Sequence, residues 1–273
     1  MPKRVAPLGD PSTSQMPDFT AYLDASGTHE GSDVVGFSGL LSAGRLWGRF
    51  VKDWSNGLAH APKVVTVLHF GEFFSALGAF HRWTDDDRHN LMSKLGPAIS
   101  RAAILAFGIL VRTRDYYEVL SREAQALYGE PVNLCLEYAL SHVLHWSRQH
   151  RGLSKGDRIG IIIDHDNKPR MQAWQRVYLD FKGRYDDTDR LALTPIFGAR
   201  AKHVPLQAAD VIAHQMYQHI RDGILESGNI REVLRWSLAG VPNVTGILKR
   251  ENLAIHERIL IEEGRLPSRG PLA

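Results

Sequence analysis

Apolar runs alternate with amphipathic stretches along most of this chain. The first run, F-T-A-Y-L, ends at Asp24, and two more cover Val34–Leu41 and Lys63–His69. Each has the length and the apolar, often β-branched content typical of a strand. We therefore predict three strands in the first part of the chain.

Helix and strand patterns then alternate. Ile104–Thr113 and the segment R-I-G-I-I-I-D are apolar throughout, as expected of internal strands covered on both faces, and Leu191–Phe197 is a last short strand. Thr84 followed by three aspartates is typical of a helix start. The predicted helices cover 84–102, 133–149, 171–183 and the segment that carries Asp210.

Three strands followed by this alternation predict an α/β fold, with a mixed sheet and helices on both of its faces. Residues 1–18 are rich in Pro, Ser and Gly and are predicted to be a flexible N-terminal tail. The main domain is expected over 19–228. The segment 229–273 is expected to be a C-terminal helical extension, with two helices separated by Pro242.

Composition narrows the function classes. Hydrophobic residues make up 44% of the 273, which is enough for a sizeable core. The formal charge of +3 permits contact with a phosphate backbone without requiring it. Cys135 is the single cysteine, which excludes a disulfide and a thiolate zinc site within a monomer.

No segment reaches the ~20 consecutive apolar residues of a membrane span, and the N-terminus has no long apolar stretch. We therefore expect a cytoplasmic protein with no membrane partner. The C-terminal helices would offer a surface for a homo-oligomer.

Four acidic residues stand at predicted strand ends or helix starts, and each follows or lies within an apolar stretch. They are Asp24, Glu72, Asp164 and Asp210. A lone buried carboxylate is costly, whereas a shared divalent cation resolves that cost, and Mg²⁺ and Mn²⁺ prefer oxygen ligands. Each acid taken alone also fits a helix cap or a turn, and Asp166 is an alternative to Asp164 because the two share one face of an extended segment.

His214 lies four residues after Asp210, on the same predicted helix face as Gln207. It would either assist proton transfer and product departure, or belong to a polar seam. The chain has no H-E-x-x-H, no phosphate-binding glycine loop and no G-x-S-x-G. Zinc-protease, nucleotide-cofactor and serine-hydrolase chemistry therefore have no support.

Several motifs, taken in order, resemble the DUF3800 family over roughly residues 20–220. They are Y-L-D-A-S-G, L-H-F-G-E-F-F, I-I-I-D-H-D and P-L-Q-A-A-D-V-I-A, and Ala25 stands where the family usually has Glu. The resemblance implies a ribonuclease-H-like fold with Mg²⁺ or Mn²⁺ as cofactor. It also implies that Asp24, Glu72, Asp164 and Asp210 form the metal-binding set.

The leading hypothesis is a metal-dependent nuclease or phosphodiesterase with two ions about 3.5–4 Å apart. Asp24 would bridge both ions, Asp164 and Asp210 would hold one each, and Glu72 would complete the set. Nucleic acid is the expected partner, and basic residues near the site would contact its phosphates: Lys168, Arg170, Arg200 and Lys202. One alternative is a non-catalytic binding module linked to mobile-element or defence systems. Another is a metal enzyme acting on a small phosphorylated substrate.

Overall fold

The structure is a computed structural model that describes residues 18–150, 157–185, 188–222 and 232–267. Within these residues, six strands form one sheet in the order β5-β4-β1-β2-β3-β6. The strands are β1 Phe19–Ser26, β2 Val34–Ala43, β3 Leu105–Arg112, β4 Ile159–Asp164, β5 Ile196–Gly198 and β6 Asn243–Leu248.

β2 runs antiparallel to both of its neighbours, and the other described strands are parallel to one another. The carboxyl ends of β1, β4 and β5 therefore meet at one edge of the sheet. The predicted α/β class with a mixed sheet is confirmed, and the arrangement is consistent with a ribonuclease-H-like fold.

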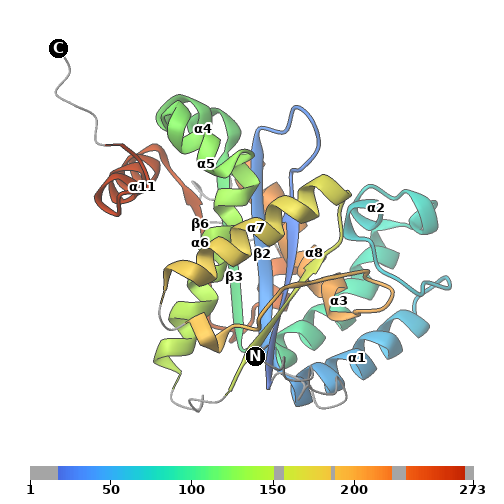
Figure 1. The fold of residues 1–273 in the computed structure, drawn as a ribbon. Helices are drawn as coiled ribbons and strands as arrows, with labels where there is room; N and C mark the ends of the chain where they lie inside the picture. Colours follow the sequence, from blue (N-terminus) through green and yellow to red (C-terminus); the bar gives the residue numbers. More distant parts are fainter. Residues whose placement is uncertain (1–17, 151–156, 186–187, 223–231, 268–273) are drawn as a thin grey trace, which may run out of the picture.

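Helices cover both faces of the sheet (Figure 1). One face carries α4 Thr113–Val119, α5 Arg122–Tyr128, α6 Pro131–Gln149, α7 Lys168–Arg184 and α11 Arg250–Glu262. The other carries α1 Gly44–Ala59, α2 Phe70–Phe74, α3 Asp85–Ala102, α8 Pro205–Arg221 and α10 Glu232–Ser237. Short 3₁₀ turns lie at Gly78–Phe80 and Thr188–Arg190.

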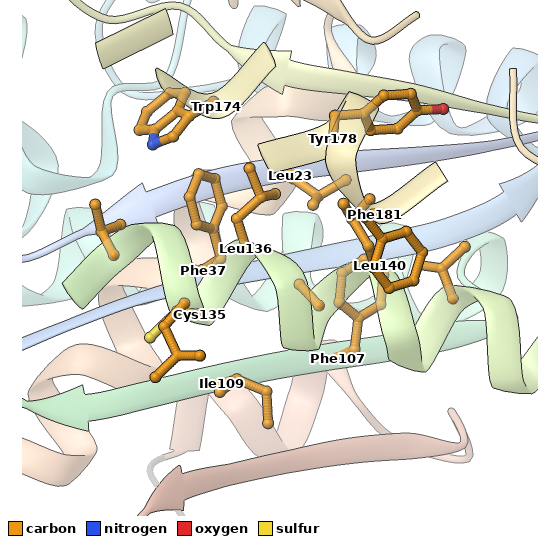
Figure 2. Close-up of a cluster of buried hydrophobic side chains, with 14 of the residues drawn as sticks. Leu23, Phe37, Phe107, Ile109, Cys135, Leu136, Leu140, Trp174, Tyr178 and Phe181 are labelled. Carbon is orange, nitrogen blue, oxygen red and sulfur yellow. The ribbon is translucent and has the colours of Figure 1, made fainter. Parts of the chain in front are cut away.

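Side chains alternate between the two faces along β1. Leu23 packs under α6 and α7, whereas Tyr22 faces the opposite layer, where it meets the Trp47 ring edge-on at 5.1 Å. Figure 2 shows the first of these cores, in which Phe37 of β2 meets Trp174 of α7 at 4.9 Å. Cys135 lies in the same core, and its burial raises the pKa of the thiol, as suits an inert side chain.

The helix start predicted at Thr84 is confirmed by a reciprocal cap. The Thr84 hydroxyl accepts from the Asp87 backbone N–H at 3.1 Å, and the Asp87 carboxylate accepts from the Thr84 N–H at 3.0 Å. This pairing satisfies two of the N–H groups that a helix leaves open at its beginning. α8 begins instead with Pro205, whose fixed φ suits the first helical position.

The strand predicted over Lys63–His69 is wrong. These residues form a loop that leads into α2, because both sides of β2 are already occupied by β1 and β3. Val65 and Leu68 are buried against the helical layer instead, and the Leu68 N–H donates to the Gln207 side chain at 2.8 Å. Tertiary packing has overridden the β-propensity of this run.

Two predicted segments near the end of the chain also differ. The strand expected over Leu191–Phe197 shortens to β5, with Leu191 making only an isolated bridge to Ile159. The extension after residue 228 contains two helices, α10 and α11, with Pro242 between them as predicted, but it also contains the strand β6, which follows Pro242 and pairs in parallel with β3. No helix in the described part of the chain is long and apolar enough to cross a membrane.

Candidate functional site

Three aspartates converge at the sheet edge where β1 and β4 end. Asp24 is near the end of β1, Asp164 is the last residue of β4, and Asp210 lies in the second turn of α8. All three are buried, with exposed fractions of 5%, 7% and 6%. Three nearly inaccessible carboxylates at one point are unusual, because each loses most of its hydration.

Neighbouring elements fix these positions. β1 and β4 are adjacent and parallel, with Leu23 opposite Ile163, so the aspartate that follows each residue reaches the same edge. α8 packs on β1 and β2, and Gln207 in its first turn makes several hydrogen bonds to neighbouring segments. The Gln207 amide accepts from the Trp54 indole at 2.9 Å and donates to the Arg200 carbonyl at 3.1 Å.

The Arg200 guanidinium lies at the centre of the cluster and donates to all three aspartates. Its Nε is 2.7 Å from Asp164 Oδ2, its Nη1 is 2.7 Å from Asp210 Oδ2, and its Nη2 is 3.3 Å from Asp24 Oδ2. The Phe70 backbone N–H adds a further donor to Asp210 Oδ2 at 2.7 Å. A charge-assisted network therefore joins β1, β4, α8 and the loop after β5.

Negative charge is in excess, because one guanidinium faces three carboxylates. Burial, reinforced by Asp210 and Asp164, raises the pKa of Asp24 well above its usual range even though Arg200 opposes the shift. Burial also raises the pKa of Asp164. Asp164 Oδ1 is buried and has no hydrogen-bond partner among the described residues. The cluster is thus incompletely neutralised and incompletely hydrogen-bonded.

The donor set fits a hard divalent cation in its chemistry, since carboxylate oxygens are what Mg²⁺ and Mn²⁺ prefer. Asp164 Oδ1 has no hydrogen-bond partner among the described residues, and the His165 Nδ1 atom lies 3.7 Å from it. In this structure, however, the three carboxylates are arranged around the Arg200 guanidinium. No group of three or more His, Cys, Asp or Glu side chains is arranged to hold a metal ion in the part of the chain that the structure describes. Arg200, expected to contact phosphates, donates to the three aspartates in this structure, and its contact with phosphates stays a prediction.

Glu72 does not join the three aspartates. It lies on α2, is exposed, and its carboxylate is directed against Gly78. Among the described residues, this carboxylate makes no hydrogen bond or ion pair. Glu72 was expected at the site because a strand over Lys63–His69 would have ended beside it. That segment is a loop, so Glu72 lies elsewhere.

His214 follows Asp210 by one turn of α8 and is half-buried among aromatic rings. Its ring lies 5.3 Å from that of Phe70 and 5.1 Å from that of Phe74. The Gln218 amide is 3.4 Å from its Nε2. His214 therefore belongs to an aromatic cluster beside the aspartates, and its place in proton transfer stays a prediction.

Asp164, and not Asp166, lies in the aspartate cluster. Asp164 faces Arg200, whereas Asp166 accepts from Arg170 at 2.7 Å, away from the cluster. Lys168 and Lys202 are exposed. Sequence reasoning missed two contacts of the cluster, the Phe70 N–H and the inward guanidinium of Arg200. The available signal was that Arg200 stands between the last strand and the Asp210 helix.

In comparisons with protein-family models, with curated proteins and with solved structures, nothing matches this chain. The resemblance to the DUF3800 family therefore stays a prediction.

Proposed function

We propose that this protein hydrolyses phosphodiester bonds with Mg²⁺ or Mn²⁺ bound by Asp24, Asp164 and Asp210. The observation that supports the proposal is the convergence of three buried carboxylates with more negative charge than Arg200 neutralises. A bound ion would supply a water of lowered pKa and would stabilise negative charge on the leaving oxygen. Nucleic acid is the proposed substrate class.

The chain's own residues have distinct tasks in this proposal. The three carboxylates bind and orient the cation, and the Phe70 N–H holds Asp210 in place. Arg200 carries five N–H donors in a planar fork, a shape that suits phosphate oxygens as well as carboxylates. Arg200 would therefore offset part of the negative charge of the aspartates before the substrate binds, and would contact the substrate phosphate afterwards. Glu72 would take part only through a movement of α2.

The test is cleavage of labelled single-stranded and duplex DNA and RNA with and without Mn²⁺. Asp24→Asn and Asp210→Asn should each abolish the divalent-dependent activity while circular dichroism shows a folded chain. Asp53→Asn is the matched control, because Asp53 is a half-exposed residue of α1 that pairs with Arg101. Wild-type-like cleavage by either cluster variant would overturn the assignment.

A second candidate is a non-catalytic binding module, and the central position of Arg200 favours it. In that case the aspartates and Arg200 would be a structural ion cluster, and partners would bind elsewhere. α11 exposes Ile255 and Ile259, four residues apart on one helix face, with exposed fractions of 49% and 42%. A second copy of the chain is the partner that we propose for this face. Mn²⁺ would then leave the thermal midpoint unchanged.

We further propose a cytoplasmic site of action. Cys135 is a lone buried thiol, and a chain without disulfides suits a reducing compartment.

A further inference from the structure

A cavity of about 390 Å³ lies beside the aspartate cluster, among α2, α3, α8 and α10. Its wall is largely aromatic, with Phe70 and Phe74 from α2, His89 from α3 and Trp236 from α10. Phe70 belongs to both places, because its backbone N–H donates to Asp210 at 2.7 Å and the residue also lines the cavity. A ligand in this cavity would therefore lie next to the aspartates.

Gln215 gives the cavity a polar group that is ready for a ligand. It follows Asp210 by five residues on α8, borders the cavity, and is only 2% exposed. Its amide makes no hydrogen bond with any described residue. Its nitrogen and oxygen are not among the inaccessible side-chain atoms that lack a partner, so the amide is open to the cavity and offers two donors and an acceptor to a bound molecule. The unpartnered Gln215 amide thus points to a ligand with a hydrogen-bonding edge.

The charges around the cavity argue against an anionic ligand inside it. Its charged lining residues, Asp85 and Arg88, form an ion pair with each other. Aromatic rings on the remaining wall suit a flat, uncharged group. The Phe74 ring is 39% exposed and Trp236 is half-buried, so both present ring surface to an incoming molecule.

We propose that this cavity binds one unstacked base of a single-stranded nucleic acid, with the Gln215 amide on the base edge and Phe74 and Trp236 against its faces. This inference rests on the proposed function, because the neighbouring carboxylates would then meet the adjoining phosphodiester. The volume falls near the lower end of ligand pockets, which span roughly 300–1,000 Å³. A paired base would be unable to offer its edge, so duplex is excluded from this cavity.

The experiment compares two fluorescent oligomers of equal length on the full chain in EDTA, where no cleavage occurs. One is a single-stranded oligonucleotide, and the other is the same backbone without bases. The first should bind at least about tenfold more tightly, since base–aromatic stacking contributes that much per base. Gln215→Leu and Phe74→Ala should each remove most of this difference.

Matched controls are Gln172→Leu on α7 and Tyr117→Ala on α4, which change a glutamine and an aromatic residue at exposed positions away from the cavity. Both should keep the difference between the two oligomers. Gln215→Leu should also keep or raise the thermal midpoint, which separates loss of binding from loss of folding.

Equal binding of the two oligomers, or a difference that survives both cavity variants, would overturn the inference even if cleavage by the aspartates is observed. Base-dependent binding without any divalent-dependent cleavage would support the cavity and defeat the proposed hydrolysis. The two proposals therefore fail separately.

Discussion

Arg200 Nη1 donates to Asp210 Oδ2 at 2.7 Å, and this bond joins the loop after β5 to the helix that begins at Pro205. The same guanidinium reaches Asp24 and Asp164, so residues that are distant in sequence meet through one cation.

Arg200→Gln should lower the free energy of unfolding in metal-free buffer by about 3 kcal/mol. The change leaves three buried carboxylates without their shared cation, and breaking a buried pair from one side has a cost of that size. Urea unfolding in EDTA measures it. Arg200→Lys keeps the positive charge but loses the planar fork. Its free energy of unfolding should therefore lie between those of the wild type and Arg200→Gln.

The same Arg200→Gln variant should respond more strongly to Mn²⁺ than the wild type. Removing a positive charge from the cluster strengthens its attraction for a divalent ion, so the rise in thermal midpoint with Mn²⁺ should be larger. If the cluster is purely structural, Mn²⁺ should raise the thermal midpoint of neither the wild type nor Arg200→Gln.

Asp24→Asn should stabilise the metal-free protein by about 1–2 kcal/mol while it abolishes cleavage. The substitution relieves repulsion among carboxylates that Arg200 neutralises only in part, and functional sites commonly sacrifice stability in this way. Chemical unfolding in EDTA provides the measurement. A marked loss of stability would indicate that the Asp24 charge is a structural requirement, in favour of the binding-module alternative.

The folded state should lose stability in mild acid through His256 of α11. Tyr128 and Tyr138 lie 2.9 Å and 3.1 Å from its two ring nitrogens, and burial lowers the pKa of the imidazole. The unfolded chain therefore binds a proton more readily than the folded chain does. This contribution is complete above an unfolded pKa of about 6.5 and is lost as the pH falls through that value toward the lower folded pKa.

Urea unfolding at about pH 7.5 and about pH 5.5 tests the His256 contribution, which is on the order of 1 kcal/mol. His256→Gln should reduce the difference between the two pH values, since the amide does not titrate. An unchanged difference in this variant would assign the acid sensitivity to other groups.

Gln215→Leu should leave the free energy of unfolding unchanged or raise it by up to about 2 kcal/mol. The residue is only 2% exposed and its amide makes no hydrogen bond with a described residue, so an apolar group of similar size breaks no hydrogen bond of the fold. A clear destabilisation would mean that Gln215 makes a contact on which the fold depends.

The convergence of Asp24, Asp164 and Asp210 was predictable because each residue follows or lies within an apolar run. Such a run predicts that the backbone of the residue lies in or on the central sheet. Strands of continuous apolar residues are central, so the acids that end them share an edge. The direction of Arg200 was not predictable, since an arginine in a loop gives no pattern that distinguishes an inward from an outward side chain. The pairing of Arg200 with the aspartates depends on contacts between residues up to 176 positions apart in the sequence.

Two further errors have local causes. The run over Lys63–His69 has strand-like residues, but strand formation requires a free sheet edge, and β3 occupies the one beside β2. Asn243–Leu248 is the opposite case, a strand in the structure that was not predicted from the sequence. As an edge strand it is only partly buried and contains Gly246, so its apolar pattern is weak. The misplaced strand also explains why Glu72 was expected at the site.

Calorimetric titration of Mn²⁺ into the wild type and Asp164→Asn tests most directly whether the three aspartates share a divalent ion. We predict saturable binding to the wild type and at least tenfold weaker binding to the variant, whose amide replaces the carboxylate whose Oδ1 accepts no hydrogen bond from a described residue. Absence of binding to the wild type, or equal affinities in the two proteins, would contradict the account.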